Sequence, residues 1–555
     1  MNAIVEKLLE GRGFAGASLE AYLDPSLRRM ASPSALPGVS AAADVILPFV
    51  RDRRKIVVFC DYDCDGVCAG AILTDTLRRL GADVDAFMPC RFTEGYGLNA
   101  ASIVRMLDEH PSAALVVTVD CGITSRDEVG TLRDRGIAVV VTDHHLPSSE
   151  VPECEGLIDP KLPGQRIGAE AIGAMDLCGA GVAFFLAGAV AARAAETGLY
   201  NGGKFAAPLL VLAGLATVVD IVPLLGQNRI LAANALRTFK NAPVGLKELL
   251  LRAQRRPVDL TSRDFGFLLG PRINAAGRIA SAKESFDLLM ERDVEAAREL
   301  AFRVDTRNSE RKTIENRMTE RAEAMIAGGC GAAIVVDGGG SLDDSCWHTG
   351  VCGIVASRLL DRYGVPTAVI VDGRGSVRAP EGFDMHAALE SCSGLLERFG
   401  GHALAGGFTV KDGAVERFRE EFTSVCEAQS AGMSTGRASG RFREPELWVE
   451  PGDLTMELHS ALAVMEPFGE GNPEPVLGLR GVAVSDIRLM GESGRHAAIA
   501  FADHRIPRAT WWGHGCDAEA LRSRSASKFD LSFTLDVSDW GCGEPHPELR
   551  ICGMR

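Results

Sequence analysis

Three aspartates, Asp61, Asp63 and Asp65, alternate within residues 61–66, which read DYDCDG. Carboxylates this close together repel one another, and burying them without a counter-charge is costly. A divalent metal ion offsets that cost, because oxygen ligands suit Mg²⁺ and Mn²⁺. Gly66 lets the chain turn sharply at the same point. The segment therefore indicates either a metal site or a solvated acidic turn.

Residue types that bind metals recur at three later positions. Asp120 precedes Cys-Gly, Asp143 leads directly into His144 and His145, and Asp220 follows a long apolar run. Carboxylates together with imidazoles form a ligand set that suits Mn²⁺. Four separate motifs favour a metal site over an acidic turn, with Asp220 as a ligand rather than a helix cap. An alternative role for Asp143 is to orient a histidine.

The elements around these motifs predict how they meet. Residues 56–59 are apolar and β-branched, which predicts a buried strand. A helical period over residues 67–80 and a strand over residues 82–88 complete a strand–helix–strand unit. Residues 114–119 and 137–141 predict two more strands, each ending at a motif. Sites form at the carboxyl edge of such sheets, so we expect the motifs to converge there.

A second group of residues suits an anionic ligand. Guanidinium groups bind phosphate oxygens in pairs, and glycine-rich turns let a backbone come close to a phosphate. An arginine in such a place can instead form a salt bridge within the protein. A histidine, here His402, can instead form a hydrogen bond that fixes its own loop. The predicted substrate-binding residues are Arg91, Arg272, Asn274, Arg278, Ser376, Arg378 and His402.

Length and composition set the class of protein. A chain of 555 residues is too long for one core, so about three or four domains are expected. The net charge of −15 argues against broad adhesion to nucleic acid but allows a local basic groove. Fifteen cysteines without framework spacing, and the lack of an apolar run of 18 residues, predict reduced thiols, a cytoplasmic location and no membrane contact.

The predicted fold is α/β with a β-rich C-terminal part. A long helix over residues 308–326, polar on one face, indicates either a connection between two α/β units or an ordinary surface helix. Five short strands near the C-terminus suit an OB-fold, whose candidate DNA-binding side chains are Arg495, Arg505, Arg508, Trp511 and Trp512, with one tryptophan facing inward. The predicted units are a lead-in over 1–50, a parallel-sheet domain over 51–230, helices over 231–330, a second α/β domain over 331–428 and the OB-fold over 440–555.

The motifs at residues 61–66, 120–122, 143–145 and 217–220 together resemble those of the DHH phosphoesterase superfamily. Within it the chain is similar to the RecJ single-strand-specific exonucleases. Residues 270–278 resemble the arginine motif of that family. Residues 347–358, 376–378 and 400–407 resemble its DHH-associated domain. Residues 467–473 resemble the segment that leads into its OB-fold.

The sequence departs from the family pattern in three places. Phe59 stands where many relatives carry a histidine, so that either one metal lacks a ligand or Asp61 supplies it. Ala379 replaces a serine that often follows the Ser-x-Arg motif, which removes at most one donor to a phosphate. Residues 338–346 form a slightly long segment that brings Asp343 and Asp344 near the expected phosphate site.

The resemblance implies two Mn²⁺ or Mg²⁺ ions and hydrolysis of phosphodiesters. Two ions neutralise the phosphate, activate a water molecule, and stabilise the attacking and leaving oxygens. Asp120 is the expected bridging ligand, and His145 is expected to face the substrate as a phosphate contact or proton donor. The predicted ligands are Asp61 and Asp63 for one ion, with Asp65, His144 and Asp220 for the other.

The implied activity is 5′-to-3′ removal of mononucleotides from single-stranded DNA, in repair and recombination. The direction comes from the resemblance alone, as do a single-strand-binding protein and a helicase as partners. One alternative is a phosphoesterase for short oligonucleotides or nucleotide bisphosphates, although such chains usually lack the strand-rich C-terminal domain. Another is a non-catalytic replication scaffold, which would be expected to have lost the carboxylates. Activity measured on substrates of graded length would distinguish the exonuclease from the first alternative. Metal-dependent turnover would distinguish it from the second.

Overall fold

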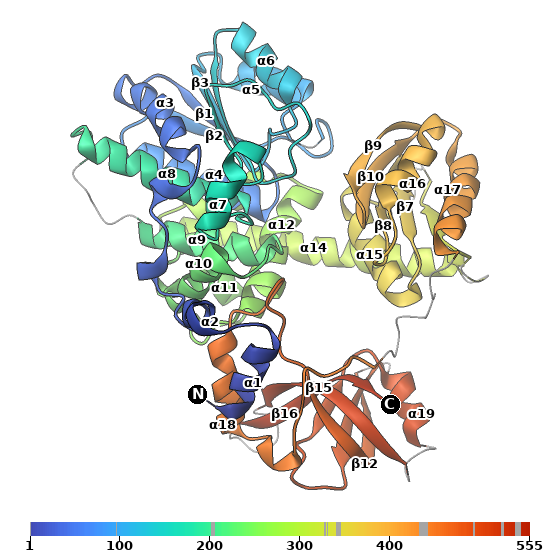
Figure 1. Cartoon of the computed structure of the whole chain (residues 1–555). Coiled ribbons are helices and arrows are strands. Elements are labelled where there is room, and N and C mark those ends of the chain that lie inside the picture. The colour runs from blue at the N-terminus through green and yellow to red at the C-terminus, as the bar shows by residue number, and fades with distance from the viewer. Residues whose placement is uncertain are drawn as a thin grey trace.

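Three lobes surround an open centre in this computed structural model (Figure 1). Two α/β lobes are joined by the long helix α14 (Val294–Ile326), and a β-rich lobe lies below them. The predicted positions Asp343 and Asp344 lie outside the described residues. The structure describes residues 2–95, 97–200, 206–326, 329, 331–339, 346–431, 442–491, 494–522, 527–538 and 545–555.

The first lobe contains the predicted parallel sheet. All its strands run parallel in the order β2-β1-β3-β4-β5, so the prediction is confirmed. Every residue of β1 and β3 is buried, as expected when helices cover both faces. The strands are β1 (Ile56–Cys60), β2 (Val84–Phe87), β3 (Leu115–Val119), β4 (Ala138–Thr142) and β5 (Gly156–Ile158).

The two faces of this sheet belong to two hydrophobic clusters. Ile56 and Val58 point to one cluster and Val57 and Phe59 to the other, because successive strand residues alternate between the faces. On the first face lie α3 (Val39–Arg51), α4 (Cys64–Arg79) and α8 (Gly179–Glu196), and α9 (Ala206–Val219) packs behind them on α4 and α8. On the second lie α5 (Ala100–Glu109) and α6 (Arg126–Asp134).

Helix α8 has the length and mean hydropathy of a membrane span, although the sequence predicted none. Arg193 and Glu196 interrupt its apolar surface near the C-terminal end. It packs against α3, α4 and α9, and 61% of the apolar stretch is buried inside the protein. Its apolar composition is therefore accounted for by its place in the core of the first lobe.

The helices after α9 extend the first core beyond the predicted boundary at residue 230. Buried side chains of these helices join the same cluster, so the helices are part of the first lobe, and α14 continues from them to the second. Helix α14 contacts α11, α12 and α13 with one half and α15 with the other. The helices are α10 (Gly226–Arg237), α11 (Val244–Arg252), α12 (Gly270–Ile279) and α13 (Lys283–Met290).

The second lobe is a smaller mixed sheet with helices on both faces. Strand β6 pairs parallel with β7, and the other pairings are antiparallel, in the order β6-β7-β8-β10-β9. One face packs on α14 and α15 (Cys352–Tyr363), the other on α16 (Met385–Ser391) and α17 (Val415–Ser430). The strands are β6 (Ile334–Asp337), β7 (Thr367–Val371), β8 (Arg374–Arg378), β9 (Leu396–His402) and β10 (Ala405–Val410).

The C-terminal lobe closes on itself, as predicted for an OB-fold. Its strands follow the order β11-β12-β13-β14-β16-β15, and an additional β12–β15 pairing completes the closure. Trp511 is buried and Trp512 is 55% exposed, which confirms that one tryptophan faces inward. The elements are β11 (Leu447–Trp448), α18 (Met456–Leu462), β12 (Leu477–Met490), β13 (His496–Phe501), β14 (Ala509–Trp511), α19 (Gly515–Arg522), β15 (Lys528–Ser538) and β16 (His546–Met554).

The N-terminal residues do not form one lead-in unit. Helices α1 (Ala3–Gly11) and α2 (Gly16–Leu23) pack in the core of the C-terminal lobe, whereas α3 packs on the first sheet. Tyr22 donates a hydrogen bond to the carbonyl oxygen of Met465 at 3.0 Å. The guanidinium of Arg229 lies 3.8 Å from the centre of the Tyr22 ring. An N-terminal segment therefore meets the first lobe and the C-terminal lobe at the junction between them.

Candidate active site

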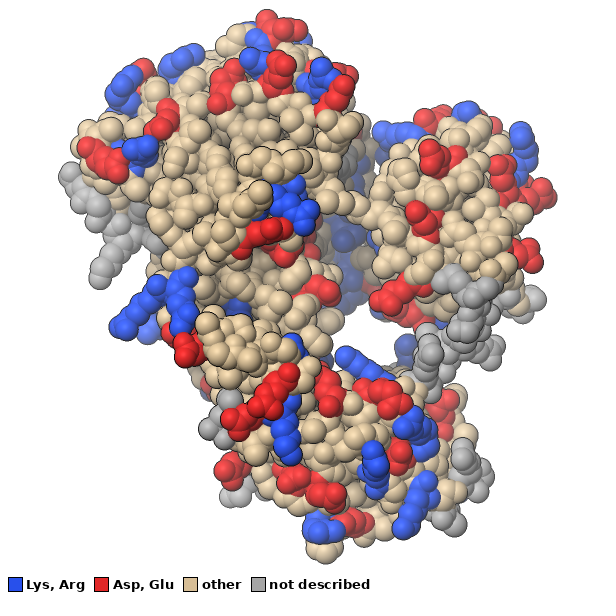
Figure 2. All heavy atoms as spheres, in the orientation of Figure 1, with Lys and Arg blue, Asp and Glu red and all other residues tan. Residues whose placement is uncertain are grey.

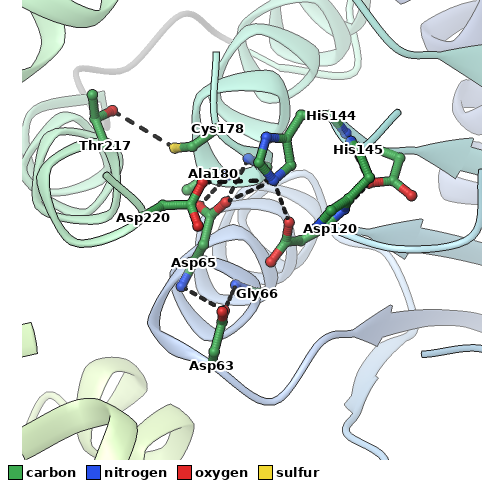
Figure 3. Close-up of polar contacts among 12 residues, drawn as sticks. Asp63, Asp65, Gly66, Asp120, His144, His145, Cys178, Ala180, Thr217 and Asp220 are labelled. Carbon is green, nitrogen blue, oxygen red and sulfur yellow. Dashed lines mark hydrogen bonds and ion pairs between the residues drawn. The ribbon is translucent and has the colours of Figure 1, made fainter. Parts of the chain in front are cut away.

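The predicted motifs meet at the carboxyl edge of the first sheet (Figure 3). Asp61 follows β1, Asp120 follows β3, and His144 lies just past β4. Asp120 has a φ of +63°, a left-handed conformation that is uncommon for residues other than glycine. Such strained residues concentrate at functional sites. Here the conformation turns Asp120 off its strand at the place where the motifs converge.

Asp61, Asp63 and Asp120 form the first ligand group, with ligand oxygens within 4.8 Å of one another. Asp63 is also the N-cap of α4, because its Oδ1 accepts hydrogen bonds from the amides of Asp65 and Gly66 at 3.0 and 3.1 Å. A β-carbon on Gly66 would lie 2.6 Å from the Asp61 carbonyl oxygen. The glycine therefore lets α4 begin directly beside the strand end.

Asp65, His144 and Asp220 form the second ligand group, again within 4.8 Å. His144 Nε2 lies 3.7 Å from Asp65 Oδ2 and 3.6 Å from Asp220 Oδ2. The same nitrogen lies 3.0 Å from Asp120 Oδ1. Asp120 thus stands between the two groups, where a bridging ligand was predicted.

Helix α8 holds Asp65 from the opposite side. The amides of Gly179 and Ala180, at its N-terminus, donate to the two Asp65 oxygens at 2.6 and 2.8 Å. A β-carbon on Gly179 would lie 2.5 Å from Asp120 Cβ, so this end of the helix closely approaches both carboxylates. Its positive dipole end favours negative charge at the site. The sequence did not predict this support, for which the only local signal is the small-residue start of an apolar helix.

The buried carboxylates of the two ligand groups favour a positive charge between them. Burial, followed by repulsion from Asp63, raises the pKa of Asp65 to about 6. Burial, followed by repulsion from Asp65, raises the pKa of Asp220 to about 9. The pKa values of Asp61 and Asp120 are also well above the usual range, chiefly through burial. Burial lowers the pKa of His144 to about 3, which keeps its ring neutral and able to bind a metal.

Several buried polar atoms of the ligand groups lack hydrogen-bond partners among the described residues. They are Asp61 Oδ1, Asp120 Oδ1 and both ring nitrogens of His144, all fully buried. Buried polar groups are normally satisfied, so this set needs a partner of another kind. Carboxylate oxygens and a neutral imidazole around one space fit two hard divalent cations.

His145 lies beside the ligand groups and is held by Asp143. Its Nδ1 lies 2.7 Å from Asp143 Oδ1, and the Asp143 carboxylate also accepts the amide of Ile123 at 2.9 Å. Burial alone would lower the His145 pKa, but the bond to Asp143 outweighs it and raises that pKa. Asp143 thus orients a histidine, as the alternative role predicted. The ligand atoms also permit a third grouping of Asp120, His144 and His145.

Phe59 is fully buried against Phe87, with ring centres 5.3 Å apart. It contributes no ligand atom where many relatives carry a histidine. Asp61 and Asp63 supply the oxygens of the first group together with Asp120. This arrangement favours the reading in which Asp61 completes the site.

A cavity of about 990 Å³ runs from this site to the second lobe. Its lining includes Arg91 and His145 from the first lobe and Ser376 and His402 from the second. Figure 2 shows Lys and Arg side chains deep in the recess between the two α/β lobes, while their outer surfaces carry both signs of charge. Three of the predicted substrate residues, Arg91, Ser376 and His402, therefore line one space between the two lobes.

Three predicted arginines converge at the start of α15. Burial, then repulsion from Arg91, lowers the pKa of Arg278 to about 10, and the same causes lower the pKa of Arg378. A β-carbon on Gly353 would lie 2.9 Å from an Arg378 nitrogen, so the helix start lies directly against that guanidinium. Close guanidinium groups at a helix N-terminus favour an anion.

Arg272 and Asn274 make contacts within the protein instead. Arg272 Nε donates to Asp305 on α14 at 2.9 Å, and its Nη1 donates to the Leu268 carbonyl at 2.8 Å. Asn274 Oδ1 accepts the amide of Cys64 at 2.7 Å, which anchors the acidic turn. Arg272 matches the salt-bridging alternative, and Asn274 positions metal ligands. Direct contact of either with substrate stays a prediction.

Comparison with known proteins agrees with this arrangement. The DHH family N-terminal domain matches residues 55–213, the DHHA1 domain residues 332–428, and the RecJ OB domain residues 446–552. The single-stranded-DNA-specific exonuclease RecJ of Dickeya dadantii is 35% identical over 539 residues, which covers 93% of this chain and 90% of that protein. The chain belongs to the RecJ family.

Other members of the RecJ family support the same assignment. The Bacillus subtilis exonuclease RecJ is 33% identical, and the match covers 89% of this chain but 61% of that longer protein. The crystal structure of Thermus thermophilus RecJ with Mn²⁺ has a TM-score of 0.79 and 30% identity, covering 99% of this chain and 75% of that one. A second structure from that organism holds Mg²⁺. The cofactors of the site are Mn²⁺ or Mg²⁺, which its ligand groups fit.

Proposed function

We propose that this chain is a metal-dependent exonuclease that removes nucleotides from the 5′ end of single-stranded DNA. The observation that carries the proposal is a cavity that joins His145, which lies beside the metal-ligand groups, to Ser376 and His402 of the second lobe. Its family relatives are named single-stranded-DNA-specific exonucleases. Repair and recombination are the processes in which such an activity is used.

Each set of residues has a separate task in this reaction. Two divalent ions would neutralise the scissile phosphate and stabilise the attacking and leaving oxygens. The ligand groups fix the place of those charges on the rigid edge of the sheet. His145, held by Asp143, faces the cavity and can donate a hydrogen bond to the phosphate or a proton to the leaving oxygen.

The direction of digestion follows from which end the pocket holds. A terminal phosphate carries more charge than an internal one, so the arginines at the start of α15 favour a phosphorylated end. Ser376 lies beside them, because a β-carbon on Gly353 would lie 3.6 Å from its Oγ. A 5′-phosphate held there would fix which bond reaches the metal site.

Arg378→Ala is expected to weaken the preference for a 5′-phosphorylated strand about tenfold or more, with a smaller effect on the chemical step. Loss of one charge-assisted contact to a phosphate is worth on the order of 1.5–3 kcal/mol. The measurement is KM and kcat on single strands with a 5′-phosphate, a 5′-hydroxyl or a blocked 5′ end. Arg417→Ala, an exposed arginine on α17, serves as the matched control.

Two outcomes would contradict the polarity. One is release of mononucleotides from a 3′-labelled end, and the other is undiminished digestion of the 5′-blocked strand. A preference for dinucleotides over long strands would instead favour the short-oligonucleotide alternative.

The C-terminal lobe offers a stacking surface for the rest of the strand. Trp512 is exposed, and its ring lies 4.8 Å from that of His496, with Arg495 exposed next to the histidine. Aromatic and basic side chains on a barrel surface bind single strands. Arg505, in contrast, is bound to Asp503 at 2.7 Å.

Trp512→Ala is expected to weaken binding of a long single strand by about 1–3 kcal/mol, the usual cost of losing one stacked base. Binding of a strand of three or four nucleotides should not change, because it would not reach this lobe. Fluorescence anisotropy with strands of graded length measures both. Phe302→Ala is the control, since Phe302 on α14 is exposed to a similar extent. An equal loss at every length would exclude this role.

A single-strand-binding protein and a helicase stay predicted partners, and a cytoplasmic location stays a prediction.

A further inference from the structure

The loop that follows the metal ligand Asp220 is strained. Ile221 has a φ of +60° and is 70% exposed. A β-branched residue in the left-handed region is a genuine outlier, and such a conformation persists only where neighbours enforce it. An exposed side chain cannot supply that enforcement by its own packing. The source must therefore lie in the residues that hold the loop further along.

A hairpin of the C-terminal lobe, residues 466–473, holds the loop from one side. The amide of Leu224 donates to the carbonyl oxygen of Glu470 at 2.8 Å. Gly471 lies so close that a β-carbon on it would be 3.0 Å from Pro223 Cβ. A β-carbon on Gly469 would be 2.7 Å from Leu224 Cδ1. Backbone of the hairpin thus lies directly against backbone of the loop.

The hairpin is itself rigid. Gly469 and Asn472 exchange backbone hydrogen bonds at 2.9 and 3.2 Å. Asn472 is 1% exposed, and its amide group donates to the carbonyl oxygens of Met465 and Pro467, both at 2.8 Å. Because these bonds and the buried Asn472 fix its shape, the hairpin can hold the backbone of the loop in place.

The first lobe holds the loop from the other side. Asn228 on α10 donates through Nδ2 to the Pro223 carbonyl at 3.0 Å and to the Asp176 carbonyl at 2.6 Å. The loop is therefore clamped between α10 and the hairpin, two and three residues after Ile221. This clamp accounts for a strained residue immediately after a metal ligand.

We propose that the hairpin of the C-terminal lobe positions Asp220, so that the metal ion held by Asp65, His144 and Asp220 depends on the docking of that lobe. The group of Asp61, Asp63 and Asp120 has no member on this loop, so an ion there would be held without it. In this role Gly471 and Ile221 are positioning residues, and neither touches substrate or metal. The C-terminal lobe would then serve the reaction at the metal site as well as binding the strand.

The test measures binding of Mn²⁺ to the full chain. The EPR signal of free Mn²⁺ falls as the ion binds, and this loss is the readout. Gly471→Ala is expected to weaken one of two Mn²⁺ ions about tenfold or more and to leave the other unchanged. Gly481→Ala is the matched control, because Gly481 has nearly the same φ, +62° against +66°, in the same lobe. A β-carbon there would lie 3.8 Å from Lys528 and far from the loop contacts. Gly481→Ala should bind both ions as the unchanged protein does.

A second substitution separates positioning from a general loss of structure. Ile221→Gly removes the cost of the left-handed conformation, so Asp220 can stay in place without the clamp. Ile221→Gly alone should bind both ions normally, and added to Gly471→Ala it should restore the weakened ion. Such coupling between residues on two lobes is what a double-mutant cycle measures.

Three results would overturn the proposal: normal binding of both ions by Gly471→Ala, equal weakening of both ions, or failure of Ile221→Gly to restore binding. If the unchanged protein bound no Mn²⁺, the metal assignment itself would fail, which is a different result. Thermal melting of each variant shows whether the lobes remain folded.

Discussion

Asp120→Asn is expected to reduce hydrolysis by about a thousandfold or more while leaving the protein folded. Asp120 Oδ1 lies between the two ligand groups, 3.0 Å from His144 Nε2, and is the oxygen best placed to serve both. An amide has the same shape but no charge, so it cannot replace a bridging carboxylate. A loss of about 4 kcal/mol of transition-state stabilisation corresponds to that change in rate.

Asparagine suits this experiment better than alanine, because Gly179 packs directly against Asp120 and a smaller side chain would leave a gap. Without metal, the substitution should even raise the melting temperature, since it removes a buried carboxylate whose ionisation is costly. The matched control is Asp159→Asn, a fully buried aspartate just after β5 that belongs to none of the ligand groups. A folded Asp120→Asn protein that digests single strands at a normal rate would exclude the bridging role.

Removing the metal should abolish activity and change how stability depends on pH. Manganese should restore activity better than calcium, because imidazole is a poor ligand for calcium. In chelator, the raised pKa values of Asp65 and Asp220, to about 6 and about 9, mean that the folded protein binds more protons than the unfolded chain. The stability that these two carboxyl groups contribute is fully present below the pKa of an aspartate in the unfolded chain. It is lost as pH rises through their pKa values in the folded protein.

His144 acts in the opposite direction, since its pKa falls from 6.5 to about 3 on folding. Its contribution to stability grows as pH rises and is complete near its unfolded value. The informative window therefore runs from pH 6.5 to about 9, where the chelated protein should melt at progressively lower temperature. Saturating Mn²⁺ should flatten this slope, because it favours the ionised carboxylates. A melting temperature that rises with pH across this window would contradict the proposed charge cluster.

Much of the site was predictable because its residues lie at the ends of strands. Burial and β-branching predict a strand, and a parallel sheet brings all its carboxyl ends to one edge. Asp61, Asp120 and His144 could thus be placed together from local patterns alone. Asp63 and Asp65 followed because they lie in the same turn, at the start of the next helix.

Contacts between distant segments could not be predicted in the same way. Arg272 lies in a glycine-bounded motif that suits a phosphate, yet its nearest carboxylate, Asp305, comes from a helix that begins over twenty residues later. No local pattern shows that α1 and α2 pack on the C-terminal lobe. The clamp on the Asp220 loop is likewise invisible in the sequence, because it joins segments on different lobes.

Helix α14 fixes how the length of this chain can change. One half packs on the first lobe and the other on α15, beside which the anion pocket forms. Each added residue in an α-helix advances the axis by about 1.5 Å and rotates everything beyond it by about 100°. A single insertion in its middle would therefore swing the pocket out of phase with the metal site, and even two whole turns would move it by ~10 Å. The length of α14 therefore sets the distance and the orientation between the anion pocket and the metal site. Insertions and deletions are expected in the loops of either lobe instead.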